Sequence, residues 1–189
     1  MGLIAHLYKI TNWLPNWDSL VFRYDSQNML GLGRWFLPVV CSFTSFYDLP
    51  FLNGLVTIFF HALGAVGICK ILNVQKKLTA FLIGAVLVSF PTVTSVMMYN
   101  YVADGYSVAF FLSVLAALFI TKNKPNYILG AVFITLSTAI YQAYITVTIM
   151  LVLYKLIDET ICSDIPFKTT FRKILYMLAT GIFGMVMYY

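Results

Sequence analysis

Long stretches without a single charged residue constrain this chain more than any other feature. Five of them run through 49–69, 78–103, 105–121, 125–154 and 174–189. A helix that crosses the hydrocarbon core of a bilayer needs about 20 predominantly apolar residues, and such runs locate the candidates. Charged residues make up only 10% of the 189-residue chain, against about 25% in ordinary soluble domains. The sequence therefore excludes a water-soluble globule and predicts an all-α, polytopic transmembrane helical bundle.

The fourth run, 125–154, is too long for one upright crossing. A single crossing would also leave the segment with Lys155 and Lys168 outside, although basic residues in short loops stay cytoplasmic far more often than they are translocated. Two short crossings that reverse near the polar patch 141–144 remove this conflict. We therefore expect about five to six membrane segments. They lie near 51–69, 78–98, 104–121, 127–140, 143–157 and 174–189.

The basic residues indicate the orientation of the bundle. Nine of the twelve follow the first and third runs or lie between the last two, namely Lys70, Lys76, Lys77, Lys122, Lys124, Lys155, Lys168, Arg172 and Lys173. The connection between the second and third runs has none. By the positive-inside rule these nine are cytoplasmic. Residues 1–48 then form an extracytoplasmic loop ahead of a transmembrane region at 49–189.

Residues 1–48 are expected to be neither a signal peptide nor a membrane span. No basic segment precedes an apolar run of sufficient length at the amino terminus. The apolar, aromatic stretch 35–47 is only 13 residues long and has Pro38 near its start, so it fits a helix lying in the membrane interface. Trp13, Trp17 and Trp35 suit the headgroup level. We predict interfacial helices in this loop.

Several kinds of chemistry are excluded. The net charge of +5 comes from scattered basic residues, which do not predict a nucleic-acid surface. Three widely spaced cysteines provide neither a disulfide framework nor a zinc ribbon. Gly31 and Gly33 are followed by Phe36 where a dinucleotide fingerprint needs glycine. His6 and His61 are too far apart to predict a metal site. We expect His61 to be a neutral imidazole bonded to a neighbouring helix rather than a functional group.

Acidic residues outside the membrane are better candidates for a site. Asp18, Asp25 and Asp48 lie in the N-terminal loop, and Asp104 lies at the outer mouth of the third run. Asp18 and Asp25 alternate with aromatic residues and Arg23. A sugar-binding site uses this combination, because carboxylates accept hydroxyl protons, rings stack on sugars and a guanidinium neutralises phosphate. The alternative is a solvated interfacial loop with anchoring tryptophans, and composition alone favours that plainer interpretation.

Five segments carry, in order, a resemblance to a known family. They are NWDSL, GLGRWFLPVV, SFYDLPFLNGL, FPTVTSVMMYNYVADGY and AIYQAY. With them the chain resembles the bacterial type II O-antigen glucosyltransferases, the serotype-converting membrane enzymes. The resemblance extends from Leu3 to Ile157. Its most specific blocks are GRWF at 33–36, DGY at 104–106 and YQAY at 141–144.

The resemblance implies a GT-C-like glycosyltransferase that moves glucose from a polyprenyl-phosphate donor to O-antigen or a related surface glycan outside the cytoplasm. It also implies an essential acid in the first extracytoplasmic loop. Asp18 is the first catalytic candidate, as general base, and Asp25 is the second, positioning the acceptor. Arg34 or Arg23 would stabilise the departing phosphate. Arg34 has an alternative role as an interfacial anchor beside Trp35.

Three further residues are candidates for substrate binding. Asp104 closes the site from the opposite wall or, equally, caps the helix that starts there. Tyr141 and Gln142 line the cavity or satisfy exposed backbone at the reversal. The cofactor remains open, a divalent metal included.

The implied partners are polyprenyl-phosphate-glucose, the glycan acceptor and membrane lipid, in the bacterial inner membrane. Family members begin with a complete span and continue with several more after the loop, so we expect this chain to correspond to less than half of such an enzyme, and to be an inactive copy if truncated. An alternative from another class is a non-catalytic transporter or flippase-like component for the lipid-linked sugar. Such a carrier would place polar groups near the bilayer midplane and contain paired interrupted helices.

Overall fold

A computed structural model describes residues 1–21, 26–44, 47–162 and 167–189. Within these ranges every regular element is a helix, which confirms the predicted all-α polytopic bundle. The N-terminal helices are short: α1 (Gly2–Ala5), α2 (Leu7–Thr11), α3 (Trp17–Val21), α4 (Ser26–Gly31) and α5 (Leu37–Cys41). Longer ones follow: α6 (Pro50–Ile71), α7 (Lys77–Ser89), α8 (Pro91–Met97), α9 (Ala103–Thr121), α10 (Tyr127–Ile140), α11 (Ile145–Cys162) and α12 (Phe167–Tyr188). Two single turns of 3₁₀ helix, η1 (Ser42–Thr44) and η2 (Gln142–Tyr144), follow α5 and α10.

Three of the helices are long and apolar enough to cross a membrane, namely α6, α9 and α12. Helices α7 and α8 together make a fourth candidate if their 44° bend lies within one span. Pro91 starts α8, and its ring and missing N–H explain why the run 78–103 does not form one straight helix. Helix α10 is apolar but has only 14 residues. The chain then reverses through η2 into α11.

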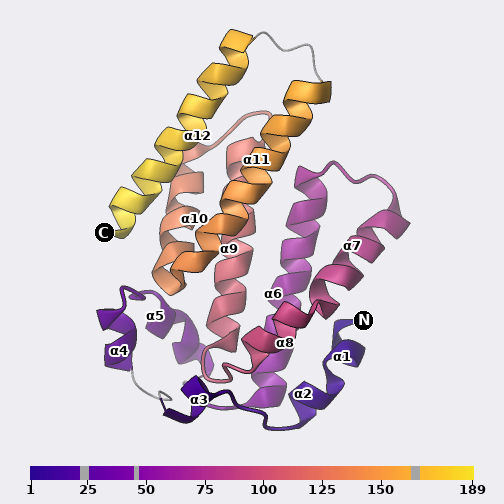
Figure 1. Ribbon diagram of the computed structural model, residues 1–189, viewed down its shortest axis with the longest axis vertical. Coiled ribbons are helices and arrows are strands. Elements are labelled where there is room, and N and C mark those ends of the chain that lie inside the picture. The colour runs from indigo at the N-terminus through magenta and orange to yellow at the C-terminus, as the bar shows by residue number, and fades with distance from the viewer. Residues whose placement is uncertain (22–25, 45–46, 163–166) are drawn as a thin grey trace.

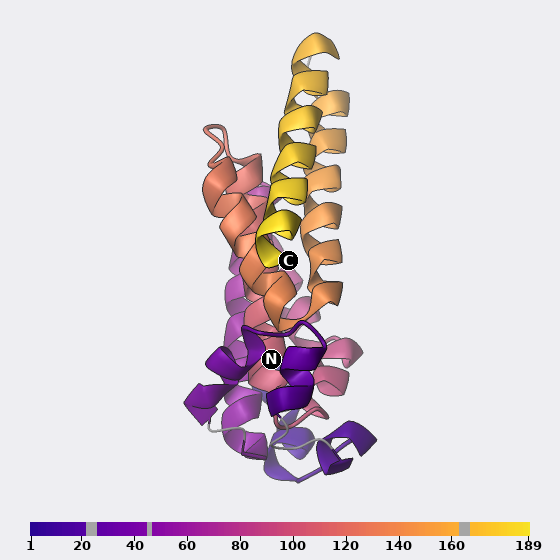
Figure 2. The same ribbon diagram turned by 90° about the vertical axis from the view of Figure 1, so that its left-hand side faces the viewer.

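The helices run antiparallel, so the connections gather at two ends (Figure 1). One end, the site end, carries α1 to α5, α8, η2 and the beginning of α9. The other, the basic end, carries the loops after α6 and α9, the end of α11 and the beginning of α12, and it includes the nine basic residues named above. Figure 2 shows α11 and α12 side by side and extending beyond the other helices at the basic end. The side of the membrane that each end faces stays a prediction.

Helix α9 is the centre of the bundle, and its hydroxyl groups bond to neighbouring helices. Ser113 Oγ in α9 is 2.6 Å from Ser137 Oγ in α10. Ser137 Oγ donates to the Ala109 carbonyl at 2.8 Å, and Thr148 Oγ1 of α11 donates to the Ser113 carbonyl at 2.9 Å. Small residues that allow close backbone approach, with hydroxyls that bond across helices, are the usual means of packing helices in lipid.

The first two helices are fixed to the bend between α7 and α8 by His6, which is 2% exposed. Its Nε2 donates to the Val88 carbonyl at 2.7 Å, so its Nδ1 accepts from Thr94 Oγ1 at 3.0 Å. The carbonyls at a helix end lack an intrahelical donor. His6 therefore satisfies a backbone group that the break before Pro91 leaves open.

A second set of contacts ties α2 and α3 to the loop before α9. Lys9 Nζ donates to Asn100 Oδ1 at 2.7 Å, and burial lowers the pKa of the Lys9 ammonium although the Asp48 carboxylate opposes this shift. Ser19 Oγ donates to the Met98 carbonyl at 2.9 Å. Because these groups are buried and bonded, the N-terminal helices have a fixed position on the site end.

Candidate functional site

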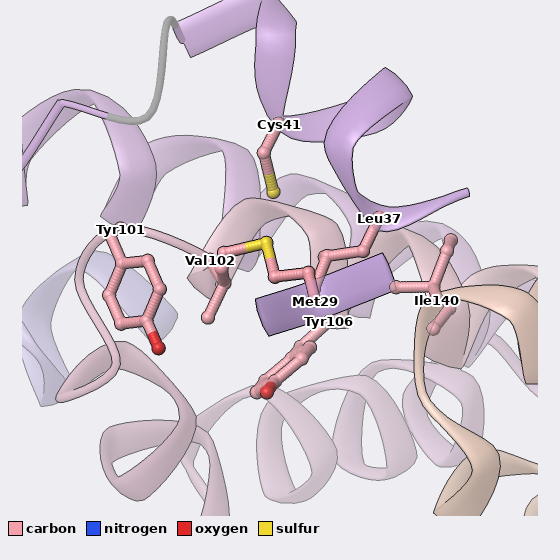
Figure 3. Close-up of a cluster of buried hydrophobic side chains, with 8 residues drawn as sticks. Met29, Leu37, Cys41, Tyr101, Val102, Tyr106 and Ile140 are labelled. Atoms are coloured by element: carbon pink, nitrogen blue, oxygen red, sulfur yellow. The ribbon is translucent and has the colours of Figure 1, made fainter. Parts of the chain in front are cut away.

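A polar pocket of about 450 Å³ opens at the site end. Its polar lining residues are Asp18, Arg34, Thr92, Ser95, Tyr99, Tyr101, Tyr106, Tyr141 and Tyr144. They come from α3, the loop before α5, α8, the loop before α9, α9 itself, and the reversal between α10 and α11. Figure 3 shows the adjoining core, in which Met29, Leu37 and Cys41 of the N-terminal segments meet Val102, Tyr106 and Ile140. The pocket therefore exists only where the N-terminal loop packs onto the bundle.

Arg34 supplies the positive charge of this pocket. Its Nη1 donates to the Tyr106 hydroxyl at 3.2 Å, and its guanidinium carbon lies 4.7 Å from the centroid of the Tyr141 ring. Its Nε is buried without a hydrogen-bond partner, and none of the ion pairs recorded between described residues involves it. A half-buried guanidinium with an unused donor suits an anionic ligand. The side chain points toward tyrosines and does not follow the interfacial anchor alternative.

The backbone around Arg34 is fixed by local turns. Gly33 has φ of +77°, a conformation that favours glycine, and its N–H donates to the Leu30 carbonyl at 2.9 Å. The Arg34 N–H donates to the Met29 carbonyl at 2.9 Å. Gln142 reaches this loop from the reversal, where its Nε2 donates to the Leu32 carbonyl at 2.9 Å. Gln142 thus contacts the loop that carries Arg34 and is not itself among the pocket-lining residues.

Aromatic faces make up much of the wall. The rings of Tyr106 and Tyr141 are stacked, with centroids 4.8 Å apart, and Tyr144 meets Tyr141 edge-on at 5.9 Å. Burial raises the pKa of Tyr101 to about 12, and the Asp18 carboxylate adds to this shift, so the phenol stays protonated at neutral pH. Flat rings with hydroxyl donors suit a sugar, whose apolar faces stack on them.

Of these tyrosines, sequence reasoning had singled out only Tyr141. The others, Tyr99, Tyr101, Tyr106 and Tyr144, lie within two of the motifs quoted above. Their clustering in those motifs was the available signal, but motif position does not show which rings face a cavity.

Asp18 is half-buried and lines the same pocket as Arg34. Helix α3 holds it there, because Asn16 Oδ1 accepts from the Ser19 N–H at 2.8 Å at the helix start. Two of the loop candidates, Asp25 and Arg23, lie outside the described residues. The structure thus brings together Asp18, Arg34 and Tyr141 from three distant parts of the sequence.

Asp104 lies elsewhere. Its side chain is 3% exposed, and it accepts from Thr44 Oγ1 at 2.9 Å and from Cys41 Sγ at 3.6 Å. Burial and the nearby carboxylate raise the pKa of the Cys41 thiol, which keeps it a hydrogen-bond donor. Asp104 therefore fastens η1 and α5 to the first turn of α9 and is not among the residues that line the pocket.

An apolar groove of about 670 Å³ adjoins the polar pocket and shares Thr92, Val96 and Tyr144 with it. His61 lines this groove, stacked on Phe110 with ring centroids 4.8 Å apart. Its Nδ1 bonds to the Thr57 carbonyl of its own helix at 2.8 Å. The expected bond to a neighbouring helix was therefore wrong, because the carbonyl one turn earlier is already within reach.

Metal coordination receives no support from the described residues, among which no three His, Cys, Asp or Glu side chains cluster closely enough to hold an ion. The pocket chemistry consists of one guanidinium, one carboxylate and several phenols. This set can bind a phosphorylated sugar and accept a proton.

Comparison with known proteins adds a family. The family model described as Glucosyl transferase GtrII matches residues 7–189. No curated protein and no solved structure matches the chain significantly. The matched region includes the whole polar pocket and the apolar groove.

Proposed function

Since this chain belongs to the glucosyl transferase GtrII family, we propose that the polar pocket is where a membrane glucosyltransferase transfers glucose from a lipid-phosphate donor to O-antigen or a related glycan. The observation that carries the proposal is Arg34, a guanidinium without a recorded acidic partner in a pocket walled by tyrosines. A glycosyl phosphate carries its negative charge next to the sugar, and the pocket offers a cation next to rings.

The donor in this proposal is a polyprenyl-phosphate glucose. Its phosphate lies against Arg34, its sugar against the tyrosines, and its hydrocarbon chain in the apolar groove. Support comes from the junction of the two cavities at Thr92, Val96 and Tyr144, since an amphiphile needs a polar and an apolar compartment in contact. The acceptor comes from the extracytoplasmic side, which we assign to the site end because the basic residues gather at the other end.

The reaction follows from these placements. The acceptor hydroxyl oxygen attacks the anomeric carbon and the bond from that carbon to the phosphate oxygen breaks. Asp18 takes the acceptor proton, and Arg34 stabilises the charge that develops on the departing lipid phosphate. Asp25 positions the acceptor and Arg23 assists with the phosphate in this proposal.

Two measurements test the proposal. The purified chain should bind undecaprenyl phosphate in detergent, measured by native mass spectrometry, and Arg34→Ala should abolish that binding. In cells that make the donor and O-antigen, Arg34→Ala and Asp18→Asn should each lower glucosylation about a hundred-fold or more. Lys124→Gln and Asp48→Asn, which remove charges outside the pocket, serve as matched controls.

The carrier alternative predicts a different pattern. If Asp18→Asn leaves transfer intact but stops movement of the lipid-linked sugar across the membrane, the chain is a transport component. If the unsubstituted chain neither binds undecaprenyl phosphate nor supports glucosylation, the proposed site is wrong.

A further inference from the structure

The basic end holds a second polar pocket, for which glucosyl transfer has no use. It has a volume of about 470 Å³ and lies where α6 and α9 end, beside α11 and α12. Four lysines line it, one from the end or side of each of these helices: Lys70, Lys122, Lys155 and Lys173. Glu159 is the single carboxylate in its described lining. The pocket therefore has a strong excess of positive charge.

Only two of the lysines have acidic partners recorded between described residues. Lys155 Nζ donates to Asp158 at 3.0 Å, and Lys173 Nζ donates to Glu159 at 2.7 Å. Lys70 is exposed, and neither it nor Lys122 takes part in these pairs. Two ammonium groups are thus available to a ligand.

General rules explain only part of this arrangement. The positive-inside rule favours lysine at this end, and the negative end of a helix dipole favours Lys70 and Lys122 at the ends of α6 and α9. Neither rule requires four lysines to share one cavity. Lys76, Lys77 and Lys124 obey the first rule and do not line it. Like charges within about 10 Å repel each other, so a bound anion would relieve the repulsion.

An apolar groove adjoins this pocket as well. It has a volume of about 720 Å³, lies between α6 and α7, and shares Lys70 and Asn73 with the lysine pocket. Val66, Phe81 and Gly84 are among its lining residues. Both helices are candidate membrane segments, so the groove faces lipid. A ligand that fills both spaces has an anionic head and a hydrocarbon tail.

We propose that this composite site binds an anionic phospholipid. The phosphate lies between Lys70 and Lys122, with Lys155 and Lys173 beyond them, and one acyl chain lies in the groove between α6 and α7. The lipid cross-links the ends of four helices through its headgroup. Its site is at the opposite end from the pocket of Arg34, so the inference stands whether or not that pocket transfers glucose.

The test uses the full chain in vesicles of phosphatidylcholine, with and without phosphatidylglycerol. Phosphatidylglycerol should raise the thermal midpoint of the protein and remain bound in native mass spectra. The double variant Lys70→Gln, Lys122→Gln should weaken that binding about thirty-fold, since each lysine near an anionic lipid surface contributes about a factor of five. The double variant Lys76→Gln, Lys77→Gln removes the same charge at the same end and should leave binding unchanged.

Three outcomes would overturn the proposal. Equal losses in the two double variants would mean diffuse attraction to the membrane surface. The same midpoint shift from inorganic phosphate in pure phosphatidylcholine would mean a site for the free anion. Unchanged binding in Gly84→Leu, which fills the groove and has open space for a side chain, would remove the acyl chain from it. Helix content by circular dichroism confirms that each variant folds.

Discussion

The guanidinium carbon of Arg34 lies 4.7 Å from the centroid of the Tyr141 ring. This contact joins the loop before α5 to the reversal between α10 and α11, and it fixes the cation of the polar pocket on an aromatic face. Arg34 can still offer its buried Nε and remaining donors to a ligand, because a ring face occupies no N–H group.

Replacing Tyr141 should separate the role of its ring from that of its hydroxyl. Tyr141→Phe keeps the face under Arg34, so binding of undecaprenyl phosphate should stay close to that of the unsubstituted chain. Tyr141→Leu removes it and should weaken binding about three- to thirty-fold, the range expected for a lost cation–π contact. Titration with the lipid phosphate and native mass spectrometry measure both. Equal affinities for the two variants would show that the ring contributes nothing.

Gly105 allows α5 to approach the start of α9. A Cβ there would lie 2.6 Å from Leu37 Cδ1 and 2.8 Å from Cys41 Sγ. Gly105→Ala should therefore displace α5 and lower the free energy of unfolding by about 1–3 kcal/mol, as overpacking does. Thermal unfolding in detergent measures the loss. Gly181→Ala, at a helix position with nothing within 4 Å of the added Cβ, is the control and should be neutral or stabilising.

Adjacent hydroxyl residues of α10 should respond in opposite directions. Ser137 bonds to α9 twice, through Ser113 Oγ and the Ala109 carbonyl, so Ser137→Ala should cost about 0.6–1.7 kcal/mol. Thr138 Oγ1 is buried without a hydrogen-bond partner. Thr138→Val keeps the shape and removes the unsatisfied group, so it should be neutral or stabilising. Unfolding midpoints of the two single variants decide this, and a larger loss for Thr138→Val would contradict the described bonding.

The cysteines offer a test of orientation. Cys162 is exposed at the basic end, whereas Cys41 is buried and burial raises the pKa of its thiol, which lowers its thiolate fraction at neutral pH. A membrane-impermeant maleimide should label Cys162 in inside-out vesicles and not in intact cells. Thr11→Cys, in the exposed part of α2 at the site end, should show the opposite pattern in a Cys162→Ser background. Labelling of Cys162 from outside would reverse the assigned topology.

Part of the site could be predicted from the sequence. Asp18, Arg34 and Tyr141 were identified by their types and by the family resemblance, and they line one pocket. Asp104 was equally identifiable, but its bonds to Thr44 and Cys41 depend on where α5 packs. The partner of His61 was wrong because periodicity does not distinguish a bond within a helix from one between helices.

Charge-free runs by themselves determined that this chain forms apolar helices, since hydrocarbon offers no partner for backbone N–H and C=O groups and helices satisfy them internally. The placement of lysines likewise determined which connections share an end. Only the tertiary structure decided which side chains form the two pockets. The physical reason is that α6, α7 and α9 are apolar around their whole circumference. Without a polar face, sequence periodicity cannot show how each helix is rotated, and close packing between distant segments sets the directions of Arg34 and the tyrosines.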